Sequence, residues 1–502
     1  MAAENNGLSR KTAKAGIWTI GAKVIAKGVD FVALLFLARF LSPTDFGVVA
    51  MAMTVVYVVE AVFELPLAAA LVRIPDPTER MYDTALTLST LRGFLVGLLL
   101  VVCAWPLSRV YDEARLIPLV LVLALAPIQR GLISPKMTVF ARQMDFRRQA
   151  GLDVMSKCIA AAAAILVAAL THSYWSIALA TILTPSVLMV GSYWLAPIQV
   201  RFTLKDWPMF SDMVSWNLVS QLVTAVNFQS GRLVLPRFIG PHPFGNYAMA
   251  SDLSNVPFQI IATPLGSPLN VAFVAAHQHG TLKETYLKAT GGIFILLAPV
   301  FCVAAFLAEP LIRLFLGAKW IESAPILAGL AWVCFIDMLP LPMPPLAVAL
   351  NQTRRIAIRN VKQALFFFPA TVIGAWAWGV PGAIGAAIVN AIFVTFLSMQ
   401  DVRAMTSATL REQVVSLAGP CAAVAVCTPI LIYGNMLMSG QQNILLLAAY
   451  LAVTGALYMG VYFAIIYGLG VVFKEQDNAE NLVRQFVHIG LVRLGLRRPV
   501  RP

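Results

Sequence analysis

The feature that most constrains this chain is a succession of long apolar runs, separated by short charged or Pro/Gly-containing breaks. A run of about 20 residues is long enough to cross a bilayer as an α-helix. The runs are continuous rather than alternating every second residue, which favours helices over a β-barrel. We therefore predict an all-α polytopic membrane protein with about fourteen spans, near residues 14–41, 45–72, 83–108, 116–141, 149–171, 174–197, 212–239, 244–276, 286–308, 322–350, 357–379, 381–402, 413–435 and 443–471.

The composition supports this class. Of the 502 residues, 59% are hydrophobic and 12% are charged, which is outside the range of soluble domains. The net charge of +13 could suggest nucleic acid, but the basic residues lie between apolar runs and in a short tail, so membrane topology explains them better. The six cysteines are scattered without metal-ligand spacing. We expect no nucleic-acid binding, disulfide framework, metal site or cofactor.

The distribution of Lys and Arg sets the expected orientation. If the N-terminus is cytoplasmic, the loops and termini on that side carry about four times as many basic residues as the opposite side, a strong positive-inside bias. Arg354, Arg355, Arg359 and Lys362 are assigned to one of these cytoplasmic loops. Both termini are then cytoplasmic, and we expect the first span to remain in the mature protein, because it is too long for a signal peptide.

The chain contains an internal repeat. Residues 38–52, ARFLSPTDFGVVAMA, match residues 236–250, PRFIGPHPFGNYAMA, at eight of 15 positions. The copies are six spans apart, an even number, which predicts a parallel repeat. We expect two six-helix lobes, residues 1–200 and 201–408, then a helix pair at 409–471 and a basic amphipathic cytoplasmic tail at 472–502 that lies on anionic lipid headgroups.

Charged residues inside the first two spans predict a polar cavity. Lys23, Lys27 and Asp30 share one face of the first helix, and charge at membrane depth normally faces a protein interior or water. Glu60 and Glu64 share a face of the second span, where they are candidates for ion coupling or for balancing nearby cations. Asp30 has the same charge-balancing role. The structural alternatives are an ion pair between Lys27 and Asp30, a carboxylate pair that only fixes helix packing, and snorkelling of Lys23.

Three arginines complete the candidate site. Arg92 and Arg130 lie well inside the third and fourth spans, and Arg232 is the buried base of the second lobe. A guanidinium offers paired donors that suit phosphate, so we expect Arg92 or Arg130 to meet an anionic substrate. Lys136 and Lys157 are interpreted as interfacial residues.

Four stretches carry a resemblance to a known family. They are residues 38–47, ARFLSPTDFG; 142–147, RQMDFR; 244–250, FGNYAMA; and 314–320, LFLGAKW. In this order they resemble the Wzx-type polysaccharide transporters of the multidrug/oligosaccharidyl-lipid/polysaccharide (MOP) flippase superfamily. The resemblance extends over most of residues 10–400.

The resemblance implies two lobes in a V and alternating access. The implied substrate is an undecaprenyl-pyrophosphate-linked oligosaccharide that moves to the outer leaflet of the bacterial plasma membrane, and membrane lipids and a polysaccharide polymerase or export machinery are the other implied partners. It also implies that cavity cations receive the diphosphate, by location Lys27, Arg92, Arg130 and Arg232. Relatives often have Asn-x-Asp in the seventh span, where this chain has Asn227-Phe228-Gln229.

Three other functions compete with this one. A drug or metabolite antiporter of the same architecture should present acids and aromatics rather than buried bases. A lipid II-type flippase also has two extra spans, but the turn motifs favour the exopolysaccharide branch. A membrane polymerase or glycosyltransferase lacks support, since the chain has no DxD pair and no long extramembrane segment. We therefore expect a transporter and not an enzyme.

Overall fold

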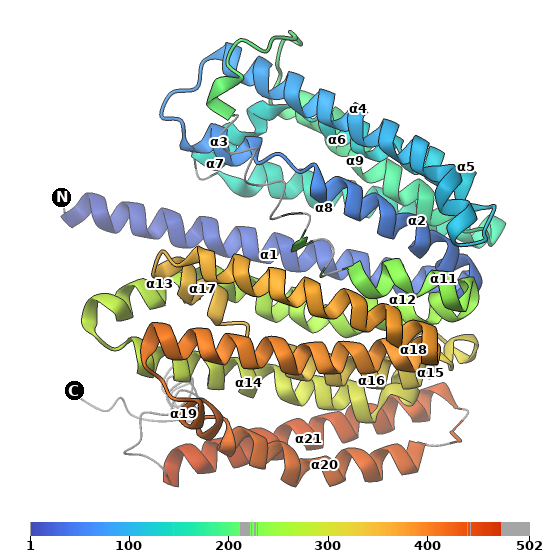
Figure 1. Cartoon of the computed structure of the whole chain (residues 1–502), viewed down its shortest axis with the longest axis vertical. Coiled ribbons are helices and arrows are strands. Elements are labelled where there is room, and N and C mark those ends of the chain that lie inside the picture. Colours follow the sequence, from blue (N-terminus) through green and yellow to red (C-terminus); the bar gives the residue numbers. More distant parts are fainter. Residues whose placement is uncertain are drawn as a thin grey trace. The chain divides into compact units, whose positions relative to one another are not determined.

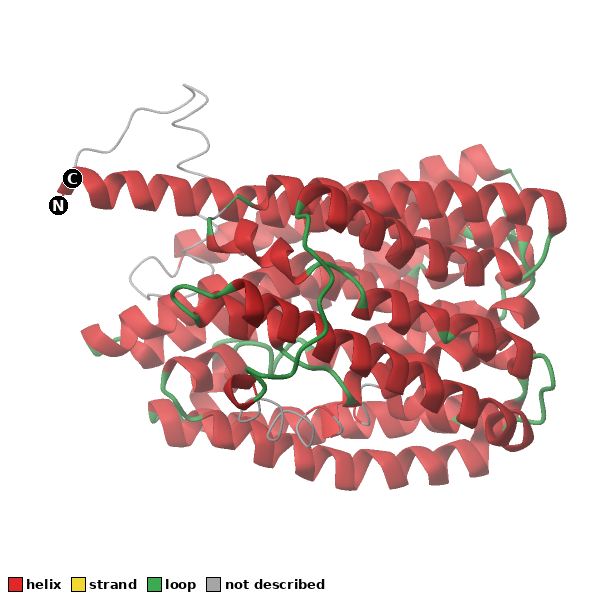
Figure 2. Cartoon of the chain, turned by 90° about the horizontal axis from the view of Figure 1, so that it is seen from above, coloured by secondary structure: helices red, strands yellow, loops and turns green. Residues whose placement is uncertain are grey.

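The computed structural model describes the backbone of residues 2–143, 145–210, 221, 223–224, 227, 229–438, 440–441 and 443–472, with side chains from residue 21 to 471. Within these ranges the chain forms helices joined by short loops and contains no strand (Figure 2). The predicted helical class is confirmed. The predicted tail, 472–502, lies outside the described side chains.

Contacts divide the chain into two compact units, Met1–Ala248 and Met249–Pro502. The predicted lobe boundary near residue 200 comes from the repeat and stays a prediction. The helices of the first unit are α1 (Ala2–Phe40), α2 (Pro43–Val62), α3 (Leu67–Arg73), α4 (Glu79–Val110), α5 (Leu116–Leu123), α6 (Leu125–Gly131), α7 (Thr138–Arg142), α8 (Phe146–Thr171), α9 (Trp175–Leu195), α11 (Pro236–Ile239) and the start of α12 (Pro241–Pro257).

Local sequence explains how α2 begins. Ser42 precedes the helix in extended conformation and accepts a hydrogen bond from the backbone N–H of Asp45, whose carboxylate accepts one from the Ser42 N–H. This reciprocal capping box, with Pro43 as the first helical residue, satisfies donors that a helix start leaves free. The turn motif of the repeat is therefore also a helix start signal.

Within the first unit, α1 packs on α8, α8 on α9, and α4 on α6. Figure 1 shows α4, α6 and α9 running side by side. Small residues allow the close approach of α4 and α6: a Cβ added to Gly93 would lie 2.7 Å from the carbonyl oxygen of Pro127, and one added to Gly131 would lie 2.4 Å from that of Ser89. Close backbone contact of this kind is typical of membrane helices.

The two copies of the repeat contact each other through their glycines. A Cβ added to Gly47 would lie 1.9 Å from the carbonyl oxygen of Pro241, and one added to Gly245 would lie 1.7 Å from that of Pro43. Each glycine therefore faces the helix start of the other copy. Only the missing side chains let the beginnings of α2 and α12 meet at this distance.

The second unit continues from α12 through a five-residue π-helical turn (η2, Phe258–Ala262). Its remaining helices are α13 (Thr263–His279), α14 (Leu282–Phe306), α15 (Ala308–Phe315), α16 (Ser323–Asp337), α17 (Met343–Ala349), α18 (Thr353–Thr406), α19 (Leu410–Val415), α20 (Ala418–Met438) and α21 (Ile444–Val472). Figure 1 shows α14, α16 and α18 side by side, and α20 pairs with α21. The core shared by α14, α20 and α21 includes the fully buried Cys302, Tyr458 and Tyr462.

Prolines and glycines mark the irregular points of this unit. The π-helical turn follows Pro257, and a run of turns that contains Pro340 and Pro342 separates α16 from α17. Such breaks are expected where proline removes a backbone donor. The 54-residue α18 turns at Gly379, which has a φ of 60°, so its two arms form a hairpin.

The described residues include nine helices long and apolar enough to span a membrane, or up to ten if one bent pair is a single span. The polytopic class is confirmed, but the number of fourteen is not. Helix α18 contains two predicted spans, and residues 322–350 are divided between α16 and α17. Of the predicted span at 212–239, residues 212–220, 222, 225–226 and 228 lie outside the described residues.

Candidate functional site

The first group of candidate residues lies where α1 packs on α8. Lys27 Nζ is 3.9 Å from the carboxylate of Asp30, one helical turn away. Asp30 also forms an ion pair with Lys157 of α8. The side chains of Lys27 and Asp30 remain 46% and 42% exposed, and Lys23 is exposed. One carboxylate therefore lies between two ammonium groups, and Lys27 keeps much of its surface open to another anion.

The sequence did not identify Lys157 as the partner of Asp30. The two residues are 127 positions apart and meet only because α1 packs along α8. The sequence could have suggested this pair, because Asp30 and Lys157 lie in different predicted spans and charges at membrane depth are normally paired.

The second group joins α2, α4 and α6. Glu60 of α2 forms an ion pair with Arg130 of α6, and its side chain is only 14% exposed. The other carboxylate oxygen, Oε1, is buried and has no hydrogen-bond partner among the described residues. Arg130 is therefore the ion-pair partner of Glu60, and Arg92 adds a longer-range electrostatic attraction.

Arg92 of α4 binds the end of α2. Its Nε donates to the carbonyl oxygen of Phe63 at 2.7 Å, and its Nη2 donates to that of Glu60 at 3.1 Å. Helix α2 ends at Val62, so these carbonyls are among those that a helix terminus leaves without partners. A cation at this end also interacts favourably with the helix dipole. Arg92 thus joins α4 to α2 while its remaining N–H groups are available for other contacts.

Glu64 and Arg232 lie in different surroundings. Glu64 Oε2 accepts a hydrogen bond from Gln221 Nε2 at 3.1 Å, and Arg232 Nη2 donates to the carbonyl oxygen of Ala248 at 3.4 Å. Asn227 and Gln229 are described, whereas Phe228 between them is not. The structure therefore brings Glu60, Arg92 and Arg130 together, with Glu64 within electrostatic range of Arg92. Lys27 and Asp30 form a separate pair.

The cations of these two groups have the chemistry to bind an anion. Ammonium and guanidinium donors within apolar helices attract phosphate or carboxylate more strongly than they would in water. The described residues contain no group of three or more His, Cys, Asp or Glu that could hold a metal ion. A separate apolar cavity of about 340 Å³ between α8 and α9 is lined by Met155, Ser186, Val187, Val190, Gly191 and Trp194, none of them charged.

The fold of this multi-spanning chain resembles that of solved membrane transporters. A lipid II flippase, MurJ, in an inward closed conformation superimposes with a TM-score of 0.70 at 15% identity, over 91% of this chain and 100% of that one. An inward-facing multidrug MATE transporter of the MOP superfamily gives a TM-score of 0.56 at 14% identity, over 77% and 96%. At these identities the likeness concerns the fold.

Residues 36–325 match the family described as "Polysaccharide biosynthesis protein", and the chain belongs to this family. One relative, the succinoglycan biosynthesis transport protein ExoT of Rhizobium meliloti, is 26% identical over 62% of this chain and 64% of its own length, slightly less than two thirds. Another, the lipopolysaccharide biosynthesis protein WzxC of Escherichia coli, is 24% identical over 82% of this chain and 85% of its own. The family predicted from the turn motifs is confirmed.

Proposed function

We propose that this protein is a flippase for a lipid-linked oligosaccharide, with an undecaprenyl-pyrophosphate-linked repeat unit as its substrate. The observation that carries the proposal is the cluster of cations on the apolar helices of the first unit, in a chain of the polysaccharide biosynthesis family. The names of ExoT and WzxC, a succinoglycan transport protein and a lipopolysaccharide biosynthesis protein, support a polysaccharide precursor as cargo.

In the proposed mechanism, Lys27 receives the diphosphate first. Its ammonium group is half exposed and already faces a carboxylate, Asp30, that also binds Lys157. A diphosphate can take one of these cations because Asp30 keeps the other, so the exchange leaves no charge alone in the apolar region. Arg92 and Arg130 bind the diphosphate next, and Lys23 and Arg232 are further contacts. In the unloaded protein the carboxylates of Glu60, Glu64 and Asp30 balance the charge of these cations.

The lobes then alternate between inward-open and outward-open states, and the polyprenyl chain stays in the bilayer. In this proposal the protein lies in the bacterial plasma membrane with both termini cytoplasmic. Membrane lipids surround it, and the polysaccharide polymerase or export machinery takes over its product. It is a carrier and makes or breaks no covalent bond.

The concentration of bases distinguishes this function from its competitors. A carrier of cationic drugs would place acids rather than Lys27 and Arg92 in the membrane, because like charge repels its cargo. A lipid II-type flippase would share the diphosphate site and differ in the sugar. A polymerase mutant would leave single repeat units outside the cell, whereas a flippase mutant retains them inside.

Replacing Lys27 with alanine is expected to reduce polymer export at least about tenfold, because one charge-assisted contact to phosphate contributes roughly 1.5 to 3 kcal/mol. Lipid-linked units should accumulate in the inner leaflet. The measurement is extracellular polysaccharide together with lectin- or glycosidase-accessible lipid-linked sugar in cells and inverted vesicles.

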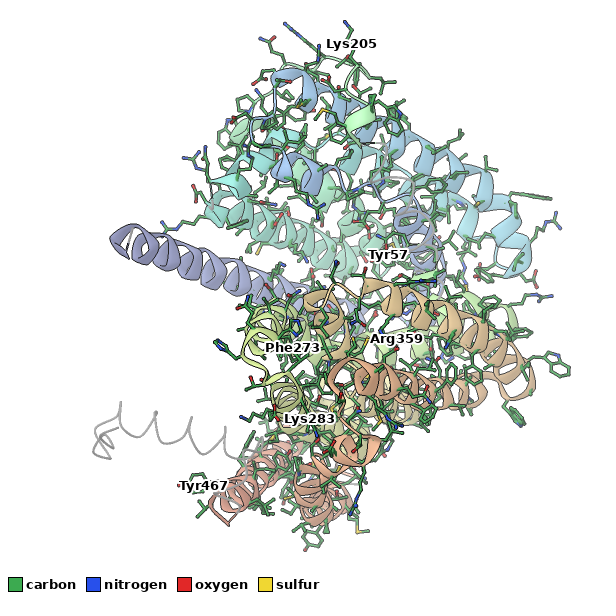
Figure 3. The ribbon with its side chains drawn as sticks, turned by 60° about the vertical axis from the view of Figure 1, so that its left-hand side comes forward. Tyr57, Lys205, Phe273, Lys283, Arg359 and Tyr467 are labelled. Atoms are coloured by element: carbon green, nitrogen blue, oxygen red, sulfur yellow. The ribbon has the colours of Figure 1, made fainter. Side chains whose placement is uncertain are left out.

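The matched control is Lys205→Ala, which removes the same charge from an exposed loop position at the edge of the first unit (Figure 3). It should export normally. Full export by a normally expressed Lys27→Ala variant would remove Lys27 from the substrate site.

A further inference from the structure

Arg359 is a partly buried cation of the second unit whose contacts are weak. Its Nη1 lies 3.3 Å from Met343 Sδ and 3.3 Å from Ser398 Oγ, and its Nη2 lies 3.3 Å from Asn360 Oδ1. Its Nε is shielded from solvent and has no hydrogen-bond partner among the described residues. A guanidinium has five N–H donors, and here none of the contacts is to a carboxylate.

The nearest acid is already engaged. Asp401 forms an ion pair at 3.2 Å with Arg355, one helical turn before Arg359. Within the part of the second unit that is described, Arg359 itself forms no ion pair. Asp401 also attracts Arg359 electrostatically, but its ion pair is with Arg355. A cation without a carboxylate in direct contact is costly in apolar surroundings, so the arrangement favours an anion supplied from outside the chain.

The surroundings of Arg359 strengthen such binding. Phe273, Tyr286 and Met343 belong to one buried cluster beside it, and Figure 3 shows Arg359 and Phe273 in the same unit. The hydroxyl of Thr395, one turn from Ser398 on the second arm of α18, is buried and has no hydrogen-bond partner among the described residues. The guanidinium of Arg359 and the hydroxyl of Thr395 are both donors from which phosphate oxygens can accept hydrogen bonds.

This end of the unit is strongly basic and close to water. Arg359 lies six residues into α18, about 9 Å along the helix from its start. Ion pairs bring the ends of the helices together here: Lys283 binds Glu412 at 2.6 Å, and Arg355 binds Asp401. The helix ends that meet here belong to α14, α18 and α19. Their basic residues are Lys283, Lys288, Arg354, Arg355, Arg359, Lys362, Arg403 and Arg411, and their acidic residues are Glu284, Asp401 and Glu412.

We propose that Arg359, with Ser398 and Thr395, forms a second anion site that takes a phosphate group at the cytoplasmic end of α18. The phosphate belongs either to the headgroup of an anionic lipid or to a water-soluble phosphate compound. The site stands on contacts of the second unit alone, so it does not depend on the substrate assigned to the first unit. The sequence analysis counted Arg359 with the basic residues of a cytoplasmic loop, although it is the third residue of the predicted span 357–379; in the structure it lies inside α18, which begins at Thr353.

The test uses the full-length protein in phosphatidylcholine nanodiscs. Inorganic pyrophosphate is titrated in one arm, and phosphatidylglycerol replaces part of the phosphatidylcholine in the other; binding is followed by native mass spectrometry and by the midpoint of thermal unfolding. Arg359→Gln should weaken binding of at least one probe about tenfold or more. Arg403→Gln removes the same charge from an exposed position near the other end of α18 and should change binding less than twofold.

The two arms identify the source of the phosphate. Binding of pyrophosphate indicates a soluble phosphate compound, and binding of phosphatidylglycerol alone indicates a lipid headgroup. If Arg359→Gln does not fold, Arg359→Lys decides the question, because lysine keeps the charge but loses the paired donors. Equal binding by wild type, Arg359→Gln or Arg359→Lys, and Arg403→Gln would overturn the proposal, as would the absence of binding in both arms.

Discussion

Replacing Gly47 with alanine is expected to destabilise the protein by about 3 kcal/mol or more and to abolish export. The new Cβ would lie 1.9 Å from the backbone oxygen of Pro241, and a backbone carbonyl cannot rotate away as a flexible side chain can. The helix starts of α2 and α12 would have to separate. Gly245→Ala should have the same effect, since its Cβ would meet the carbonyl oxygen of Pro43 at 1.7 Å. The measurement is the midpoint of thermal unfolding in detergent, with export in cells.

The control is Gly28→Ala in α1. A Cβ at Gly28 would have nothing within 4 Å, and alanine favours a helix over glycine by about 1 kcal/mol. This variant should be as stable as the wild type or more so. Normal stability of both Gly47→Ala and Gly245→Ala would show that the two helix starts do not touch in the functional protein.

Replacing Arg130 with alanine is expected to destabilise the first unit by about 3 kcal/mol, because Glu60 would lose its ion-pair partner and keep only the longer-range attraction of Arg92. The Glu60 side chain is 14% exposed, and its Oε1 has no hydrogen-bond partner within the described parts of the chain. The double variant Glu60→Gln with Arg130→Gln removes both charges, and two amides can hydrogen-bond. It should recover most of the lost stability, as measured by thermal unfolding of the purified variants.

The double variant also separates packing from substrate binding. If Arg130 meets the substrate, the stable double variant should still export roughly tenfold less polymer than the wild type. Full export by this variant would assign Arg130 to helix packing alone. Lys136→Gln is a useful comparison, because Lys136 pairs with Glu79, whose side chain is 74% exposed, and its loss should matter little.

The helical architecture could be predicted because bilayer thickness sets the length of an apolar run. The boundaries of the spans were harder to predict from the sequence. The predicted span at 45–72 is interrupted after Val62, and α3 begins at Leu67, just beyond Pro66. The predicted break between the spans at 357–379 and 381–402 falls at Gly379, where the backbone of α18 leaves the helical conformation with a φ of 60°. Hydropathy measures the length of a run, whereas the backbone conformation at one glycine decides whether a run ends.

The charged residues of the site were predictable one by one, but their partners were not. Lys27 and Asp30 are one turn apart, so their contact follows from helical periodicity. The pair formed by Glu60 and Arg130 joins residues 70 positions apart and depends on which helices pack together. The role of Arg92 depends on where α2 ends, because it binds carbonyl oxygens that exist as free acceptors only at a helix terminus.

The reciprocal contact of Gly47 and Gly245 has a consequence for the origin of the chain. Each copy of the motif presents the same surface to the other, which is the form of an isologous interface between two identical subunits. A surface that is complementary to an identical copy of itself can form a dimer of identical subunits. The contact therefore fits an ancestor of half this length that assembled as a homodimer before duplication and fusion joined the two subunits in one polypeptide.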